Sequence, residues 1–276
     1  MMKSYYSNGK LLLTGEYVVL DGALALAIPT KFGQSLSVEP IVERHIVWKS
    51  FNSDRSIWFE DTFSFDEITS GMKNTFDAVS LRIIQILNVA KTLNPEFLNT
   101  EKGYKIATYL TFPRDWGLGT SSTLIDNVAQ WAEVNAYQLL EKTFGGSGYD
   151  IACAQNNIPL TYQLKYLDNT LEHRNIEKVS FNPDFKDELY FVYLNKKQNS
   201  RDGITVYNVN KNNIEGAISE INTITKDIIN CETLECFDTL IKQHETIISN
   251  IIRQKTAKDL FFNDFKGSCM EFPCST

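Results

Sequence analysis

The chain has 276 residues, 43% of them apolar, and a formal net charge of −7. This length is enough for one large domain or two smaller ones. The acidic balance argues against nucleic acid as a partner, because nucleic-acid binding normally needs a basic face. No apolar run approaches the roughly 18 residues that span a membrane, and the N-terminus lacks the pattern of a signal peptide. We therefore expect a cytoplasmic protein that binds neither nucleic acid nor a membrane.

The cysteines indicate reduced thiols rather than disulfides. There are five of them, an odd number, and their spacing fits no disulfide framework. The chain has three histidines, and none of them lies close in sequence to a cysteine, so a zinc site is not expected.

The first 65 residues predict β-structure. Two apolar segments, residues 10–20 and 23–30, flank a turn at Asp21 and Gly22 and indicate a hairpin. Residues 44–65 alternate aromatic and polar side chains, which predicts further strands. We therefore expect the N-terminal region to be rich in strands.

Helical periodicity begins near residue 75, where apolar residues recur at helical spacing as far as residue 93. A strand is predicted at residues 104–112 and is followed by a glycine-rich loop. The next helix is predicted to run from this loop to about Lys142, and a second, short helix at residues 151–156.

The character of the chain changes near residue 178, and we place a domain boundary there, between residues 1–178 and 179–276. Residues 189–194, "LYFVYL", predict a buried strand. Two helices with isoleucine-rich apolar stripes follow, between residues 214 and 251. His244 lies on the second stripe, where a hydrogen-bonded core histidine is expected rather than a catalytic one.

The stretch "PRDWGLGTSSTLIDNVAQW" places glycines and hydroxyls directly before a helix. Backbone N–H groups at a helix start have no intrahelical partner, and the helix dipole adds partial positive charge there. Because glycine lets an anion approach the backbone closely, a strand, a glycine loop and a helix start together favour a phosphate site. The alternative is a capped helix preceded by a flexible turn.

The sequence excludes several other classes of site at this loop and at the glycines near residue 147. No segment matches the Walker A pattern, and protein-kinase signatures are absent. A dinucleotide fingerprint would need a third glycine where Ser122 stands. The segment "GGSGY" ends in Tyr149 rather than in the glycine of a hydrolase nucleophile elbow.

The pattern Pro-x3-Gly-Leu-Gly-Thr-Ser-Ser resembles the second motif of the GHMP kinases, the superfamily of galactokinase, homoserine kinase, mevalonate kinase and phosphomevalonate kinase. Two more segments are similar to family motifs in the expected order: "NGKLLLTGEYVVLDGALALA" near the N-terminus and "GGSGYDIACA" near residue 150. Together the three motifs cover roughly the first 160 residues. The "GSGYD" spelling, and Tyr17 where mevalonate kinases usually have histidine, look more like phosphomevalonate kinases and a bacterial branch marked by Gly-Tyr-Asp-Ile-Ala.

The resemblance implies an ATP site and a magnesium site. Phosphoryl transfer needs mainly positioning and positive charge near the transferred group. The predicted ATP-binding residues are those of the loop and the helix start: Gly117, Leu118, Gly119, Thr120, Ser121 and Ser122. Ser121 would reach Mg²⁺, and Glu141 is expected as a second metal ligand by similarity to related kinases.

The resemblance also implies the catalytic and substrate-binding residues. Asp150 falls on the catalytic aspartate and could accept the acceptor's proton, while Lys10 could keep that carboxylate ionised and steady the transferred group. Without the motif, Asp150 reads as a helix cap and Lys10 as a solvated lysine at a strand end. The substrate-binding residues implied are Glu16, Tyr17, Ser147 and Gly148.

The basic segment "NKKQNSR" contains Lys196, Lys197 and Arg201. It could bind an anionic acceptor such as a phosphomonoester. A solvated charged loop is an equally good interpretation.

The resemblance implies an α+β, two-domain GHMP kinase fold, with an N-terminal domain like ribosomal protein S5 domain 2 and a smaller C-terminal domain. The expected function is ATP- and Mg²⁺-dependent phosphorylation of a small molecule, with mevalonate or phosphomevalonate as the first candidate. The alternatives are a sugar or homoserine as acceptor, a related ATP-consuming decarboxylase, or a non-catalytic protein that keeps the fold. A dehydrogenase is a more distant alternative.

The family's third glycine-rich motif is missing from the sequence, which ends "DLFFNDFKGSCMEFPCST". We interpret this as a truncated C-terminal domain. An exposed sheet edge tends to pair with another chain, so a homodimer with weak or absent catalysis and largely retained ATP binding is expected.

Overall fold

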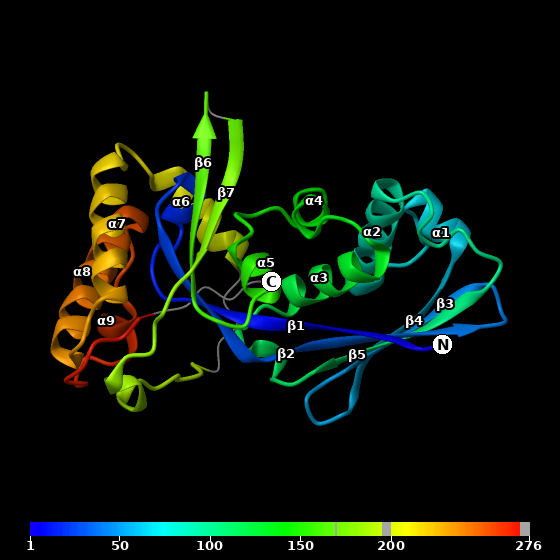
Figure 1. The fold of residues 1–276 in the computed structure, drawn as a ribbon, viewed down its shortest axis with the longest axis horizontal. Coiled ribbons are helices and arrows are strands. Elements are labelled where there is room, and N and C mark those ends of the chain that lie inside the picture. Colours follow the sequence, from blue (N-terminus) through cyan, green and yellow to red (C-terminus); the bar gives the residue numbers. More distant parts are fainter. Residues whose placement is uncertain (169, 195–199, 271–276) are drawn as a thin grey trace. The chain divides into compact units, whose positions relative to one another are not determined.

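The computed structural model describes residues 1–168, 170–194 and 200–270 (Figure 1). The chain divides into two compact units, each made of segments far apart in the sequence. Unit 1 contains Met1–Gly9 and Thr30–Gln155, and unit 2 contains Lys10–Pro29 and Asn156–Thr276. Within the described residues, no helix combines the length and apolarity needed to cross a membrane.

The sheet of unit 1 has the strand order β4-β3-β5-β2. β3 and β5 are parallel, and the other neighbouring pairs in this order are antiparallel. β1 also pairs with β2. The strands are β1 (Lys3–Leu12), β2 (Ala25–Ile41), β3 (His45–Phe51), β4 (Ile57–Ser64) and β5 (Gly103–Leu110), and the first two continue into unit 2.

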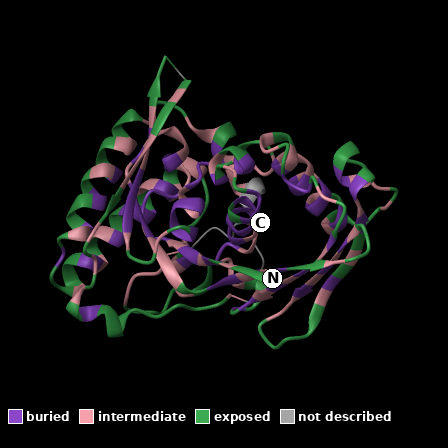
Figure 2. Cartoon of the chain, turned by 45° about the vertical axis from the view of Figure 1, so that its right-hand side comes forward, coloured by how far each residue is buried: buried purple, intermediate pink, exposed green. Residues whose placement is uncertain are grey.

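The helices of unit 1 pack on this sheet through one apolar core. Buried residues alternate along β3, as expected for a strand with one covered face. Ile46, Trp48 and Ile106 of the sheet share the core with Ile84 of α2 and Ile125 of α3. Buried residues are coloured purple in Figure 2. The helices are α1 (Phe65–Ser70), α2 (Ala78–Leu93), α3 (Thr120–Ala132), α4 (Ala136–Glu141) and α5 (Tyr149–Ala154), with a short 3-10 turn, η2, at Arg114–Trp116.

Unit 2 has its own apolar core. The first part of β2 pairs with β6, and β6 pairs with β7, both antiparallel. α7 and α8 lie side by side and contribute Ile221, Ile228 and Ile241 to the core, as their isoleucine stripes predict. The elements of this unit are η1 (Val18–Asp21), β6 (Leu160–Leu167), β7 (Thr170–Lys178), η3 (Asp184–Glu188), α6 (Ser200–Asn210), α7 (Glu215–Ile229), α8 (Leu234–Ile252) and α9 (Ala257–Phe261).

The two compact units do not coincide with the two domains expected on either side of residue 178. Residues 25–27 of β2 pair with β6, and β6 pairs with β7, so the chain up to Lys178 is tied to the segment 10–29 within unit 2. The segments of the two units therefore alternate along the chain, and no single boundary in the sequence can separate the units. The assignment of a nucleotide-binding domain to residues 1–178 stays a prediction.

Three predicted elements are wrong in their extent or type. The first strand ends at Leu12 and does not continue to residue 20, because Gly15 and Tyr17 have positive φ values of 85° and 59°, which interrupt an extended backbone. The helix expected to reach Lys142 breaks into α3 and α4. Glu133 ends α3 in the left-handed region, and the Asn135 side chain then caps α4.

The strand predicted at residues 189–194 is the third error. These residues belong to no strand, and Tyr190 and Val192 are exposed. Their composition suits a strand, but β-propensity expresses packing on a sheet and needs a neighbouring strand. The following segment, with Lys196 and Lys197, lies outside the described residues, as do the side chain of Arg201 and the end of the chain at 271–276.

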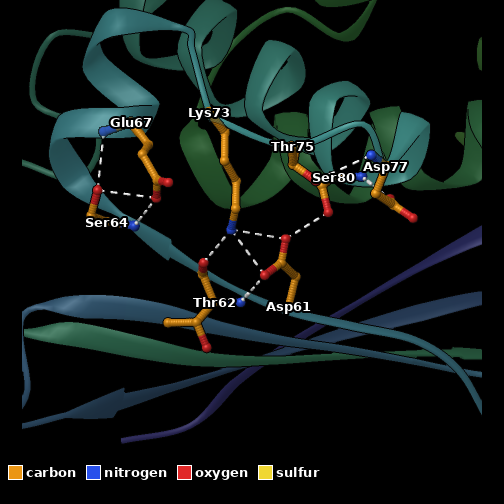
Figure 3. Close-up of polar contacts among 8 residues, drawn as sticks. All are labelled: Asp61, Thr62, Ser64, Glu67, Lys73, Thr75, Asp77 and Ser80. Atoms are coloured by element: carbon orange, nitrogen blue, oxygen red, sulfur yellow. Dashed lines mark hydrogen bonds and ion pairs between the residues drawn. The ribbon is translucent and has the colours of Figure 1, made fainter.

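A polar cluster fastens β4 to the α1–α2 region in unit 1 (Figure 3). The Lys73 ammonium lies 2.9 Å from the Asp61 carboxylate and donates to the Thr62 carbonyl. The Ser80 hydroxyl, in the first turn of α2, donates to the same carboxylate. Partial burial alone would raise the pKa of Asp61, but hydrogen bonds from Ser80, Lys73 and the Thr62 N–H together outweigh it and lower that pKa.

Replacing Asp61 with asparagine should weaken this cluster. We expect Asp61→Asn to lower the free energy of unfolding at pH 7 by about 1–3 kcal/mol, the usual effect of losing hydrogen bonds to a charged group. Because the folded-state pKa is lowered, this stabilisation is present above the ordinary value of 3.8 and is lost as the pH falls through the folded pKa. Urea unfolding at several pH values measures it.

The control for this variant is Asp54→Asn, in an exposed turn where the carboxylate accepts hydrogen bonds from the nearby Ser56 and from its own backbone. It should unfold like the wild type at pH 7. Equal stability of Asp61→Asn and wild type at pH 7 would contradict the assignment.

Candidate active site

The glycine loop of unit 1 begins after β5 and ends at α3. Gly117 and Gly119 have φ values of 71° and 90°, in the left-handed region that favours glycine. Leu118 between them is buried, and its carbonyl would lie 2.6 Å from a Cβ atom placed on Gly9. Gly9 must therefore be glycine for β1 to approach the loop, a requirement that the sequence analysis missed.

Aromatic contacts hold the 3-10 turn that leads into the loop. The Trp116 ring meets Phe32 edge to face, with ring centroids 5.8 Å apart. The Arg114 guanidinium lies 4.3 Å from the centre of the Trp58 ring, within the range of a cation–π contact. These side chains on β2, β4 and η2 fix the approach to the glycine loop, and no local sequence pattern signals them.

The N-terminus of α3 can accept an anion. Gly119 is the N-cap, and no side chain caps this helix. The Thr123 N–H bonds the Gly119 carbonyl at 3.0 Å, so the N–H groups of Thr120, Ser121 and Ser122 precede the first intrahelical bond. Three N–H groups and the positive end of the helix dipole thus point out of the helix start, without a competing side-chain cap.

The two serines at this helix start have different roles. The Ser122 hydroxyl is buried and donates to the Gly119 carbonyl at 3.0 Å, so it braces the turn. Ser121 is half-buried, which makes it the better of the two as a metal ligand. The alternative that a serine side chain caps the helix does not hold.

α3 is also anchored along its length by polar contacts to β2. The Thr123 hydroxyl donates to the Gln34 side-chain carbonyl, and the Asn127 amide donates to the Gln34 backbone carbonyl, both at 2.9 Å. All three residues are buried. Because buried polar bonds are directional, they fix the rotation of α3, which apolar packing alone would leave looser.

Asp150 is the second residue of α5, a helix that packs against α3. Its N-cap is Gly148, with φ 91°, so the alternative in which Asp150 serves as the N-cap is wrong. The carboxylate is half-buried and accepts the Ile151 N–H at 3.0 Å. Ser147 and Gly148, the predicted substrate-binding residues of this segment, are buried and precede Tyr149 and Asp150. The structure therefore places two glycine-opened helix starts in the same unit.

Glu141, the other predicted magnesium ligand, is the exposed last residue of α4. The turn that follows it contains Gly145 and Gly146, both with positive φ and open space where a Cβ would be. In the described part of the chain, no group of three or more acidic, histidine or cysteine side chains could hold a metal by itself. Mg²⁺ typically combines one or two protein oxygens with phosphate oxygens and water, so Ser121 suits a nucleotide-bound ion.

The remaining predicted residues, Lys10, Glu16 and Tyr17, belong to unit 2. Lys10 is 1% exposed, so the solvated-lysine alternative is wrong. Glu16 is also buried. The Tyr17 ring stacks on Tyr207 of α6, with centroids 5.8 Å apart, which gives it a packing role within this unit. Substrate contact by Glu16 and Tyr17 stays a prediction.

The neighbouring ring of Tyr207 belongs to a polar group of the same unit. Its hydroxyl donates to Asp21 at 2.5 Å, and Lys211 pairs with that carboxylate at 2.9 Å. Burial, followed by the bond to Asp21, raises the pKa of Tyr207. The tyrosine is therefore neutral and fixed as a donor, which holds α6 against η1.

The segment around Gly15 is held by α7 and α8. The buried His244 accepts the Gly15 N–H at its Nε2 atom, 3.0 Å away, so the ring proton lies on Nδ1, 3.3 Å from Glu245. The Thr14 and Thr225 hydroxyls are hydrogen-bonded at 2.8 Å. The expected role of His244 as a core histidine is confirmed, and its contact with the first motif is new.

Removing the His244 imidazole should destabilise unit 2. In His244→Leu the Gly15 N–H loses its acceptor in a buried place, which we expect to lower the free energy of unfolding by about 1–3 kcal/mol. Chemical denaturation measures the loss. His173→Leu is the control, because that side chain is 57% exposed, and it should be nearly neutral. Wild-type stability of His244→Leu would show that the contact is dispensable.

Comparison with known proteins defines the class of fold. No protein-family model matches the chain, and no curated protein matches its sequence. Solved structures do match. The Lin0012 protein of Listeria innocua is 14% identical, with a TM-score of 0.66, and covers 100% of this chain and 88% of its own. The mevalonate kinase of Methanococcus jannaschii is 16% identical, with a TM-score of 0.62, over 91% of this chain and 80% of its own.

A phosphomevalonate kinase of Streptococcus pneumoniae is similar as well, with 15% identity and a TM-score of 0.56 over 91% of this chain and 80% of its own. At such low identity these likenesses show the fold alone. The chain therefore has the α+β fold of the GHMP kinases, as the sequence motifs predict. The predicted branch with the Gly-Tyr-Asp-Ile-Ala motif stays a prediction.

Proposed function

We propose that the protein is an ATP- and Mg²⁺-dependent kinase that transfers the γ-phosphoryl group to a small molecule. The observation that carries the proposal is the N-terminus of α3, which opens at a left-handed glycine and has no side-chain cap. In a chain with this fold, such a helix start suits the phosphates of a nucleotide. A similar solved structure, a phosphomevalonate kinase, holds phosphomevalonate and AMPPNP, which supports nucleotide use.

The proposed reaction assigns tasks to the helix start of α3 and to Asp150, both in unit 1. The N–H groups of residues 120–122 bind and orient the phosphates, and Ser121 offers a hydroxyl to the metal. Mg²⁺, when bound with the nucleotide, would neutralise charge on the phosphate oxygens. Asp150 accepts the proton of the acceptor hydroxyl. The roles of Lys10, Glu16, Tyr17 and Glu141 stay predictions from the sequence resemblance.

Mevalonate or phosphomevalonate is the first candidate for the acceptor. The motif spelling favours them, and similar structures include kinases for both. Similar structures also include a galactokinase and a heptose 1-phosphate kinase, so a sugar is the alternative acceptor. Homoserine, suggested by the sequence resemblance, completes the set.

The test has two parts. Calorimetric titration should show MgATP binding and no NAD binding. Release of ADP is then measured with mevalonate, phosphomevalonate, galactose and homoserine, each with a control that lacks the acceptor. One acceptor should raise ADP release and be recovered as its phosphate. Wild-type protein that binds no MgATP would overturn the proposal, and MgATP binding without transfer to any acceptor would favour a non-catalytic binding protein.

A further inference from the structure

A buried carboxylate on α3 has no role in the chemistry proposed above. Asp126 is 1% exposed, in the middle of the helix that carries the phosphate-binding N-terminus. It accepts the Ser7 hydroxyl of β1 at 2.7 Å, the Gln130 amide at 2.8 Å and the Gln155 amide at 2.9 Å. Ser7 and Gln155 lie outside α3, so this carboxylate links three elements of unit 1.

A carboxylate at this position needs a reason, because burying an ionised group is costly unless hydrogen bonds satisfy it. The three described partners of Asp126 are neutral donors, and hydrogen bonds to a charged acceptor are stronger than those between neutral groups. A leucine here would add to the apolar core at lower cost. The carboxylate is therefore best explained by the directional bonds that it makes.

The bond to Gln155 acts on the helix that carries Asp150. α5 has only 6 residues, too few to be a stable helix by itself, so its orientation depends on its surroundings. Gln155 is its C-cap, and its amide is bound to Asp126. Asp150 lies one turn and a half earlier on the same short helix. Because α5 packs against α3, a rotation of α5 would displace the Asp150 carboxylate relative to α3.

We propose that Asp126 is a positioning residue for phosphoryl transfer, which acts through Gln155 to hold α5, and hence Asp150, in a fixed orientation to the phosphate-binding end of α3. This inference rests on the proposed function and extends it to a residue that no family motif includes. Transfer depends strongly on orientation, and a displacement of about 1 Å can cost about 100-fold in rate. Binding of the nucleotide at α3 does not need α5 to be fixed. An effect on the rate of phosphoryl transfer can therefore be separated from an effect on nucleotide affinity.

The chain offers a matched pair of variants for the test. Gln130 and Gln155 each donate an amide hydrogen to the same carboxylate, but Gln130 belongs to α3 itself and Gln155 to the end of α5. Both residues are exposed, so replacement by leucine should leave the fold intact. Gln130 also donates to the Ser7 hydroxyl at 3.5 Å, a contact that does not involve α5. Gln155→Leu removes the hydrogen bond that links α5 to α3. Gln130→Leu removes a similar hydrogen bond to Asp126 within α3 and leaves the link between the two helices in place.

Three quantities are measured on the full chain. They are the affinity for MgATP by calorimetry, the turnover with the acceptor that stimulates ADP release by the wild type, and the hydrogen–deuterium exchange of residues 149–154. For Gln155→Leu we expect faster exchange in α5 and turnover lowered at least about 10-fold, with MgATP affinity within about 2-fold of wild type. Gln130→Leu should resemble wild type in all three.

A conservative variant tests the chemistry of the link. In Asp126→Asn the new amide can donate to the Gln155 side-chain carbonyl once the Gln155 amide has turned over, so turnover should stay within about 3-fold of wild type. Asp126→Leu allows no such bond and should behave like Gln155→Leu.

Equal turnover in Gln155→Leu and Gln130→Leu, or unchanged exchange of α5 in Gln155→Leu, would overturn the inference while MgATP binding remains. Wild-type protein that binds no MgATP would instead overturn the proposed function, and the positioning role with it.

Discussion

Replacing Gly119 with valine should abolish detectable nucleotide binding. Gly119 is the N-cap of α3 with φ 90°, a conformation that a β-branched residue adopts only with strain. The first turn of the helix must then rearrange, and the N–H groups of residues 120–122 lose their common direction. Losing two or three hydrogen bonds to a charged phosphate amounts to roughly 3 kcal/mol or more, so MgATP affinity should fall by at least about 100-fold.

The matched control for this variant is Gly71→Val. Gly71 also has a positive φ, of 69°, but it is the C-cap of α1, at a different place in unit 1. It should show a similar loss of stability with MgATP affinity close to wild type. Calorimetry on both folded variants makes the comparison. A folded Gly119→Val protein that binds MgATP like the wild type would place the nucleotide elsewhere.

Asp150→Asn should separate catalysis from binding. The substitution keeps the shape of the side chain and an oxygen that can accept the Ile151 N–H, but it removes the charge and the base. Because general-base contributions are typically about 100-fold or more, turnover should fall by at least that factor while MgATP affinity is kept. Turnover is measured with the acceptor that the wild type phosphorylates.

Asp77→Asn is the control for the loss of charge. Asp77 is the N-cap of α2, where its side chain accepts the Ser80 N–H, and asparagine caps a helix about as well as aspartate. This variant should keep both turnover and affinity. If Asp150→Asn also kept wild-type turnover, Asp150 would have only the local structural role that its contact with Ile151 suggests.

Local patterns in the sequence were sufficient for α2, α5, α7 and α8 and for the helix start at the proposed site, but not for α1, α6 and α9 or for the break between α3 and α4. The helical spacing before residue 93 predicts α2, and the isoleucine stripes predict α7 and α8. Glycines before a run of hydroxyls predict the glycine-opened start of α3, whose N-cap is Gly119. These features depend on residues within a few positions of one another, so the chain alone specifies them.

Other predictions failed, or could not be made, where a distant partner decides the structure. Residues 189–194 have the composition of a strand but lie in no sheet, because a strand needs a neighbour that its own sequence cannot supply. Gly9 reads as an ordinary strand glycine until the Leu118 carbonyl is seen beside it. In the same way, His244 is predictable as a core residue, but not as the acceptor of the Gly15 N–H.

The sequence by itself determined the class of fold, the helix start that can hold a phosphate and the position of Asp150 at the beginning of a short helix. Only the tertiary structure decided that Asp126 joins α3, β1 and α5. It also decided that each compact unit is built from two segments that alternate along the chain. The reason is physical. Motifs and periodicity express short-range backbone geometry, whereas a buried hydrogen bond such as Ser7 to Asp126 joins residues 119 positions apart and forms only when the whole unit has folded.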